Sequence, residues 1–221
     1  MSLPPNVEES YGTEIIRKGI HLLSLSIPVI YYFIPKLTAL AILIPLTLAF
    51  GLSDIGRLIV PAIGRIYNTY FGFLLRSHEQ NDRGRRLNGA TYVLLAATLL
   101  IFFFPKVIAI TAIAVLIISD TSAALIGRRY GKHRFISKSL EGAGAFFLSG
   151  LLVVALAPKV DYLPAEYMIG AAAAFLGAVV EASAIGLDDN LSIPLTVGTV
   201  MWILYLLFLP AVNLFKLDGM I

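Results

Sequence analysis

Long apolar segments separated by short polar ones dominate the chain. An apolar run of about 17 residues or more is long enough to cross a bilayer as an α-helix. Pro28, Pro45 and Pro194 fall inside such runs and should bend the helices or open them locally. We therefore expect an all-α, polytopic membrane protein of about seven transmembrane helices, over residues 17–34, 37–53, 88–104, 107–127, 143–158, 164–186 and 191–213.

The composition supports a membrane protein. Of the 221 residues, 58% are hydrophobic and only 14% are charged, and the mean hydropathy is +0.84. No linker or repeat divides the chain, which predicts one integral membrane domain over residues 1–221. The absence of cysteine excludes disulfides, thiolate metal sites and thiol nucleophiles. The polar, acidic stretch 1–16 carries no basic segment before the first apolar run, so we expect no cleavable signal peptide.

Charge alternates sharply between successive loops. Lys36, Lys106, Lys159 and Lys216 fall on one side of the predicted membrane. The other side holds 13 of the 17 basic residues, and basic loops favour the cytoplasm, so the N-terminus is predicted inside and the C-terminus outside. With a net charge of only +3 and the basic residues explained by the bilayer, no nucleic-acid partner is expected.

Acidic residues gather on the same side as the basic ones, although acids contribute little to membrane orientation. A catalytic face at the inner membrane surface would explain this gathering. The residues concerned are Glu14, Asp54, Glu79, Asp82, Asp120, Glu141, Glu181, Asp188 and Asp189.

The segment 119–144 holds the strongest candidate site. Asp120 follows a long apolar run, and a carboxylate about 20 Å into a helix crossing a core of about 30 Å is costly and marks a site. Small residues recur at helical offsets on its face, and basic residues, a hydroxyl and Glu141 follow. The basic residues alone are also explained by the positive-inside rule.

Two other polar segments should meet this one at the inner face. Glu14, Lys18 and His21 form one stripe entering the membrane, unless they are only an interfacial helix end. Glu181 and the run 188–190 border the last predicted helix; helix capping explains one of these residues but not all of them. Asn88 and Gly89 lie at the cytoplasmic mouth of the third helix. The stretch 58–75 is half apolar and predicts an interfacial helix, and the basic run 83–86 favours lipid headgroups.

Together these residues predict transfer of a phosphoryl or nucleotidyl group to a lipid. Oxygen ligands suit Mg²⁺, which shares them with substrate phosphates, and basic side chains would hold those phosphates. There is no GxxxxGK[ST] motif, so this is not a P-loop protein. The oxygen ligands are Asp120, Glu141, Glu181, Asp188 and Asp189, and the phosphate-binding side chains are Arg128, Arg129, Lys132 and Lys138.

The segments EIIRKGIHLLS, LNGATYVLL, SDTSAALIGRRYGKH, SKSLEGAGA and EASAIGLDDNLSIPL resemble the CTP-dependent lipid-alcohol kinases, which include dolichol kinase, phytol kinase and the yeast-type diacylglycerol kinase. The resemblance covers about 14–195. The family pattern is D-x-x-A-x-x-x-G-x-x-x-G, then a basic residue, Ser or Thr, and Glu-Gly. Two features depart from the pattern of dolichol kinases: the spacer is short, and Ser137 stands where those enzymes often have a lysine. Both argue against a narrow assignment to dolichol kinase. The matching residues are Asp120, Ala123, Gly127, Gly131, Lys138, Ser139, Glu141 and Gly142.

The resemblance implies that CTP, with Mg²⁺ or another divalent cation, donates its terminal phosphate to the hydroxyl of a membrane prenol such as a polyprenol, dolichol, phytol or geranylgeraniol. Asp120, Lys138, Asp188 and Asp189 would be catalytic, and Asp120, Glu141, Asp188 and Asp189 would bind the metal. The nucleotide would contact Ala123, Gly127, Arg128, Gly131, Lys132, Lys138, Ser139, Glu141 and Gly142. The acceptor side would comprise Lys18, His21, Asn88, Glu181 and Asn190.

Three alternatives remain at this point. One is a CTP-dependent diacylglycerol kinase. Another is a cytidylyltransferase that makes a CDP-lipid, because the related phosphatidate cytidylyltransferases share an Asp and a Lys-Glu-Gly loop but attack the α-phosphate and release pyrophosphate. The third is a small transporter or scramblase, although such proteins keep their polar groups near the membrane midplane, and here the charges lie at one face.

Overall fold

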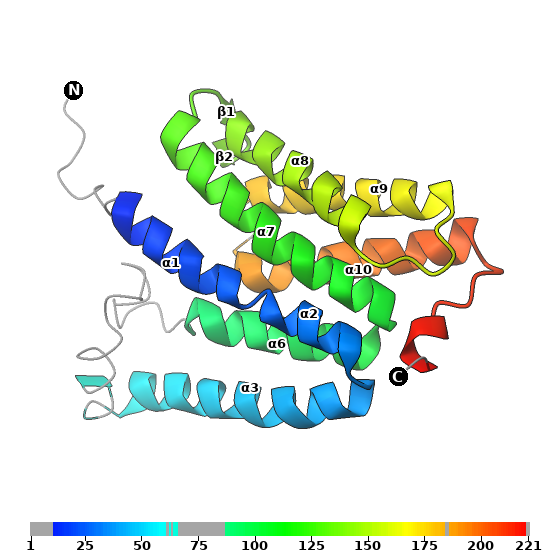
Figure 1. Cartoon of the computed structure of the whole chain (residues 1–221). Helices are drawn as coiled ribbons and strands as arrows, with labels where there is room; N and C mark the ends of the chain where they lie inside the picture. Colours follow the sequence, from blue (N-terminus) through cyan, green and yellow to red (C-terminus); the bar gives the residue numbers. More distant parts are fainter. Residues whose placement is uncertain (1–10, 61, 63, 66–86, 184–185, 220–221) are drawn as a thin grey trace.

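The computed structural model describes residues 11–60, 62, 64–65, 87–183 and 186–219 (Figure 1). The described residues are almost entirely helical, and the only strands among them are two short ones that form a hairpin. The elements in chain order are α1 (Tyr11–Leu23), α2 (Ser26–Phe33), α3 (Lys36–Ile59), α6 (Gly89–Phe103), α7 (Lys106–Tyr130), β1 (Arg134–Phe135), β2 (Lys138–Ser139), α8 (Leu140–Leu156), α9 (Pro164–Ser183), α10 (Asp189–Phe208) and the 3₁₀ helix η2 (Lys216–Gly219).

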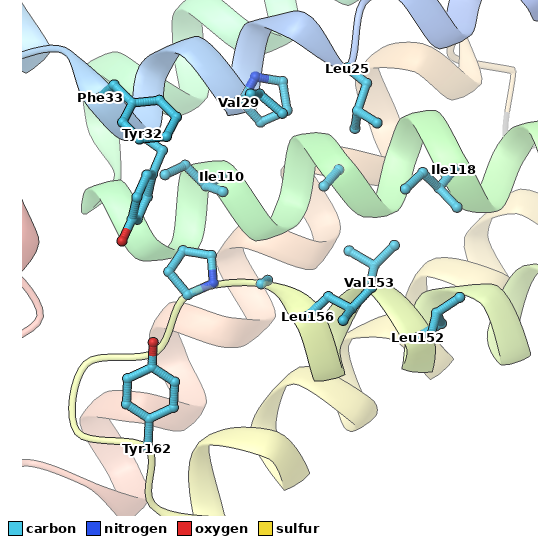
Figure 2. A pocket seen from close by; sticks show the side chains of 14 residues that line it. Leu25, Val29, Tyr32, Phe33, Ile110, Ile118, Leu152, Val153, Leu156 and Tyr162 are labelled. Carbon is cyan, nitrogen blue, oxygen red and sulfur yellow. The ribbon is translucent and has the colours of Figure 1, made fainter.

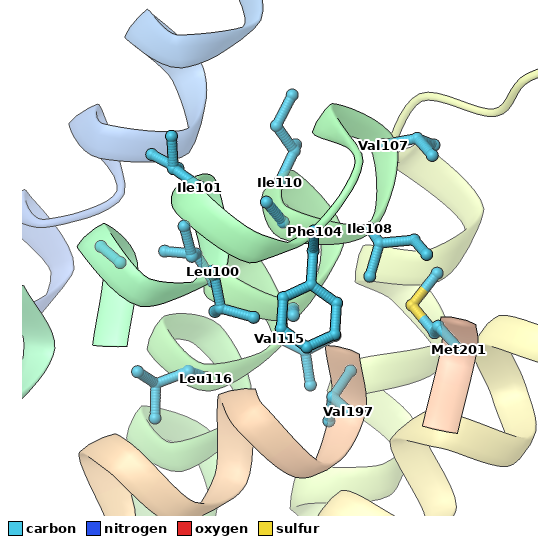
Figure 3. Packing of buried hydrophobic residues seen from close by; sticks show 14 of the residues in the cluster. Leu100, Ile101, Phe104, Val107, Ile108, Ile110, Val115, Leu116, Val197 and Met201 are labelled. Atoms are coloured by element: carbon cyan, nitrogen blue, oxygen red, sulfur yellow. The ribbon is translucent and has the colours of Figure 1, made fainter. Parts of the chain in front are cut away.

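Helix α7 is the centre of the bundle. It packs most extensively on α8, and it also contacts α1, α2, α6, α9 and α10, whereas α3 lies at the edge against α6 (Figure 1). Side chains of α6, α7 and α10 interlock in the core, where Phe104 lies close to Val197 and Met201 (Figure 3). A helix that is apolar on all sides is expected only where other helices surround it, which places the single acid Asp120 inside the protein.

The predicted membrane class is confirmed, with changes in the helix boundaries. Among the described residues, α3, α7, α9 and α10 are long and apolar enough to cross a bilayer, and α6 and α8 are shorter apolar helices. The first predicted span is two helices, because Pro28 has no N–H to continue the hydrogen-bond ladder and the chain breaks at residues 24–25. The last predicted span is too long at its end: α10 ends at Phe208, two residues before Pro210.

Polar groups at the end of the bundle that holds the α8–α9 connection have structural partners. Glu166 is fully buried and accepts hydrogen bonds from the backbone N–H groups of Val160, Asp161 and Leu163 and from the Tyr205 hydroxyl, at 2.8–3.0 Å. Lys106 donates to the Ile34 carbonyl at 2.9 Å. These contacts hold the connecting turns at this end together.

The connections of α7 to α8 and of α9 to α10 lie at the opposite end of the bundle, together with the start of α1 (Figure 1). The described part of the predicted polar face therefore gathers at one end of the fold. The interfacial helix expected over 58–75 lies largely outside the described residues. Its residues 58–59 belong to the end of α3, and 62, 64 and 65 are helical. The basic run 83–86 lies wholly outside the described residues.

Candidate functional site at the polar end of the bundle

The glycines of the sequence pattern allow α7 and α8 to approach each other. A Cβ on Gly131 would stand 2.3 Å from the Gly127 carbonyl oxygen and 2.8 Å from Ser139, and a Cβ on Gly142 would stand 3.0 Å from Ser139 Oγ. The Ser139 hydroxyl caps α8 by accepting from the Gly142 N–H at 3.1 Å. The space beside these glycines is thus occupied by Ser139 and the neighbouring helix, as small residues permit in membrane helix pairs.

The hairpin between α7 and α8 fixes the position of Lys138. Its two strands pair Phe135 with Lys138, and the tight turn puts Ile136 at a φ of 53°, a strained conformation for a β-branched residue. Ser137 then ties the turn to the end of α9, where its N–H donates to the Ala182 carbonyl at 3.0 Å and its hydroxyl to the Ser183 carbonyl at 3.1 Å. Lys138 is therefore held beside α9.

Lys138 joins the ends of α9 and α10. Its Nζ donates to Glu181 Oε1 at 2.7 Å and to Asp189 Oδ2 at 2.8 Å. Burial by itself lowers the pKa of Lys138, but the negative charges of Asp189 and Glu181 raise the pKa above its ordinary value, so the lysine stays protonated. The second Glu181 oxygen, Oε2, is buried and meets no hydrogen-bond donor among the residues that the structure describes.

Asp120 forms a second charged group with α1. Lys18 Nζ donates to Asp120 Oδ2 in an ion pair whose side chains are 5% and 9% exposed. His21 Nε2 lies 3.7 Å from the same oxygen. Asp120 is also close enough to Glu181 to repel its charge, so the Lys18 and Lys138 groups are neighbours. These residues come from four separate parts of the sequence.

A polar pocket of about 110 Å³ opens beside this ion pair. It has room for a few water-sized groups. Asn88 caps α6 through its side-chain oxygen, which accepts from the Ala90 N–H at 3.0 Å, and the start of α6 lies against the Asn190 amide. The polar residues that line the pocket are Arg17, Lys18, His21, Ser24, Asn88 and Asn190. The structure thus brings together four of the five residues predicted on the acceptor side, while Glu181 lies with Lys138.

Other predicted site residues have local structural partners. Asp188 caps α10: its Oδ1 accepts from the Asn190 N–H at 3.0 Å and from the Asn190 side-chain amide at 2.9 Å. Glu141, in the first turn of α8, accepts from His133 Nδ1 at 2.7 Å and from the His133 N–H. Arg128 and Lys132 are exposed at the end of α7 and in the following loop. Ala123 is buried between α7 and α8, where its carbonyl lies beside Gly142.

The four predicted metal ligands are not gathered around one point. Asp120 pairs with Lys18, Asp189 with Lys138, Glu141 with His133, and Asp188 with the start of α10. Within the described ranges, no three acidic or histidine side chains form a cation site. The described residues therefore form no cage of three or more such side chains for a magnesium ion.

Arg17 and Ser24 line the polar pocket but were not among the site residues predicted from the sequence. Arg17 was counted only as part of the basic side, and Ser24 follows His21 by three residues, a helical offset that could have extended the polar stripe. Asp54 was noted as one of the acids, but its part in the structure was not foreseen. It is buried and accepts from the Asn88 N–H at 2.7 Å and the Thr91 hydroxyl at 2.6 Å, which fixes the start of α6 next to the pocket.

The fold and the site define a polytopic helical membrane protein with a charged, partly buried centre at one end of its bundle. Lysines that hold carboxylates in this way can bind and neutralise phosphate groups next to a lipid. The chain is 30% identical over 166 residues to CTP-dependent diacylglycerol kinase 1 of Schizosaccharomyces pombe, covering 69% of this chain and 74% of that protein. It therefore belongs to the family of CTP-dependent lipid kinases, which are phosphotransferases.

Further similarities agree with this family. An uncharacterized protein of Rickettsia prowazekii is 28% identical over 190 residues, covering 85% of this chain and 93% of that protein. The dolichol kinase of Schizosaccharomyces pombe is 35% identical over 94 residues, covering 39% of this chain and 17% of that enzyme. No family model matches the chain, and no solved structure does.

Proposed function

We propose that this protein transfers the terminal phosphate of CTP to the hydroxyl of a membrane lipid alcohol at the cytoplasmic face, with a prenol as the acceptor. The observation that carries the proposal is the junction of two charged groups. Lys18, which is paired with Asp120, lines the polar pocket. Lys138 is paired with Glu181 and Asp189, and Glu181 is close enough to Asp120 to be repelled by its charge. The pocket beside Lys18 suits the hydroxyl of a lipid, and the ammonium group of Lys138 suits the phosphates of a nucleotide.

Lys138 is the proposed anchor for the nucleotide. A triphosphate that enters at this end would accept hydrogen bonds from the Lys138 ammonium in competition with Asp189, which is 25% exposed on its side chain. Arg128 and Lys132 are exposed nearby and would add positive charge. Mg²⁺ is proposed to arrive as part of the substrate, on the phosphate oxygens of CTP. The close packing around Ser139 would keep the hairpin in place.

Asp120 is the proposed base for the acceptor. The lipid hydroxyl would occupy the pocket beside His21, Asn88 and Asn190, with its proton directed to the Asp120 carboxylate. As the hydroxyl oxygen bonds to the terminal phosphorus, the bond from that phosphorus to the oxygen bridging it to the β-phosphate breaks. CDP leaves with that oxygen, and Asp120 holds the proton. Such transfer depends on position and on charge neutralisation by groups like Lys18 and Lys138.

Diacylglycerol is the second candidate acceptor, because a relative that covers 69% of this chain is a CTP-dependent diacylglycerol kinase. A prenol and a diacylglycerol both present one primary hydroxyl, and the pocket would accept either. The proposed reaction is the same with both lipids, and only the apolar part of the acceptor differs.

Product analysis tests the proposal. Purified protein would be incubated with magnesium, CTP and either a prenol or diacylglycerol, and the nucleotide products would be separated. We expect CDP and a phosphorylated lipid. Pyrophosphate and a CDP-lipid, formed when phosphatidate is supplied, would instead identify a cytidylyltransferase. Transfer from ATP but not from CTP would refute the proposed donor.

The cytoplasmic orientation has its own test. Because the chain contains no cysteine, single variants Lys132→Cys and Asn213→Cys mark the two ends of the bundle. In intact cells, an impermeant thiol reagent should label the Asn213→Cys variant and spare Lys132→Cys. The reverse pattern would place the site outside.

A further inference from the structure

A long apolar groove runs along the outside of the bundle between α2 and α8 (Figure 2). Its floor is α7, where Ile110, Ala114 and Ile118 recur every four residues and so share one face. Val29 of α2 forms one wall and Leu152 of α8 the other. The volume of about 390 Å³ falls within the range of ordinary ligand pockets, about 300–1,000 Å³.

One end of the groove reaches the polar site. Leu25 lines the groove, and the preceding residue, Ser24, lines the polar pocket, so the break between α1 and α2 borders both. On α7, Ile118 lies two residues before Asp120, and this spacing turns the two side chains to different faces of the helix. From Ile118 to Ile110 the floor extends about 12 Å along the helix, at about 1.5 Å per residue. The groove therefore begins at the break between α1 and α2, next to the polar pocket, and leads away from it along α7.

The walls suit a hydrocarbon chain. No charged side chain lines the groove within the described part of the chain, and its other end closes with Pro158 and Tyr162. Leu156, on the wall, is 78% exposed, so the groove is open sideways, towards the lipid. A soluble peptide would find no hydrogen-bonding partner along such a floor, whereas a lipid tail needs none.

We propose that this groove holds the hydrocarbon chain of the lipid acceptor and thereby places its hydroxyl in the polar pocket beside Lys18 and His21. The inference rests on the proposed function and adds the position of the acceptor. A lipid would slide in from the bilayer with its chain along Ile110, Ala114 and Ile118. Since bilayer and groove are both apolar, the groove contributes mainly alignment and not hydrophobic affinity. Filling it should therefore weaken acceptor use selectively.

Photo-crosslinking tests the position without any variant. A prenol that carries a diazirine in mid-chain would be irradiated with the wild-type protein in bilayers, and the labelled residues would be mapped by mass spectrometry. We expect label on α2, α7 and α8 along the groove, reduced by excess unlabelled prenol. Label spread equally over the exposed face of α3, or reduced as strongly by phosphatidylcholine as by prenol, would overturn the inference.

Filling the groove supplies the kinetic test. Ala114→Phe should raise KM for a long-chain prenol about tenfold, leave KM for CTP unchanged, and affect a short acceptor such as geraniol far less. The matched control is Ala41→Phe on α3, an exposed alanine that does not line the groove, which should change none of these values. Equal KM values for both variants would refute the groove.

The two proposals fail in different ways. If no acceptor is phosphorylated while the groove is still labelled, the proposed function fails and the lipid site stands. If phosphorylation proceeds normally while labels avoid the groove, the function stands and this inference fails.

Discussion

Removing either partner of the buried pair Lys18–Asp120 should destabilise the protein, and removing both should not. The two side chains are 5% and 9% exposed, so each single change leaves a charge with little access to water. Loss of one partner of a buried pair costs about 3–5 kcal/mol. We therefore expect Lys18→Met and Asp120→Asn each to lower the free energy of unfolding by about that amount. Because the double variant leaves no uncompensated charge from the pair, it should recover most of the loss.

Activity should follow a different pattern. Asp120→Asn should reduce turnover per folded molecule at least about a hundredfold, the lower end for loss of one electrostatic element in an active site, and the double variant should remain inactive. Unfolding would be followed by reversible denaturation in micelles, and turnover by CDP release from the folded fraction. Recovery of both stability and turnover in the double variant would show that Asp120 serves only to neutralise Lys18. Unchanged stability in both single variants would refute the buried ion pair.

A control separates loss of a buried lysine from loss of the site. Lys106 lies at the other end of α7, is 1% exposed, and donates to the Ile34 carbonyl at 2.9 Å. Lys106→Met should lower the free energy of unfolding, and turnover per folded molecule should stay close to wild type. A fall in turnover as large as that of Asp120→Asn would mean that the assay reports general disruption of the bundle.

Three further predictions concern the connections at the polar end. Lys138→Met should abolish turnover. Because the pKa of Lys138 is raised in the folded protein, the stability from its ion pairs is complete below the unfolded pKa of about 10.4 and is lost only as pH rises through the folded pKa. The wild type should therefore keep this interaction up to about pH 10, and an earlier alkaline loss of turnover that is absent in Lys138→Arg would contradict the prediction. Gly131→Ala should cost about 1–3 kcal/mol by overpacking against Gly127 and Ser139, measured by unfolding in micelles against Gly144→Ala, which meets nothing within 4 Å. Asp188→Ala should lower the free energy of unfolding by about 1 kcal/mol, because α10 loses its N-terminal cap, and Asp188→Ser should lower it much less. If Asp188→Ser is stable but inactive, Asp188 takes part in the chemistry.

Much of the fold could be predicted from local patterns. The apolar segment 107–127 lies within α7, and Pro28 marks the break between α1 and α2. The position of Asp120 and Lys138 near the same end of the bundle follows from the alternation of charge between successive loops. That alternation can be recognised without knowledge of how the helices pack. The interpretation of Gly127 and Gly131 as sites for nucleotide contact stays a prediction, but the structure adds a packing reason for them that sequence spacing did not reveal.

Local sequence determined the class of protein, the separation of polar and apolar ends and the family pattern, because hydropathy, charge and motif spacing are properties of neighbouring residues. Only the tertiary structure decided that Lys138 bridges to Asp189, 51 residues away, and that Asp120 pairs with a lysine 102 residues away. Which charges meet depends on how each helix is rotated and how deep it lies, and packing of the whole bundle sets both. The groove beside α7 arises in the same way, because it exists only where α2 and α8 diverge over a shared floor.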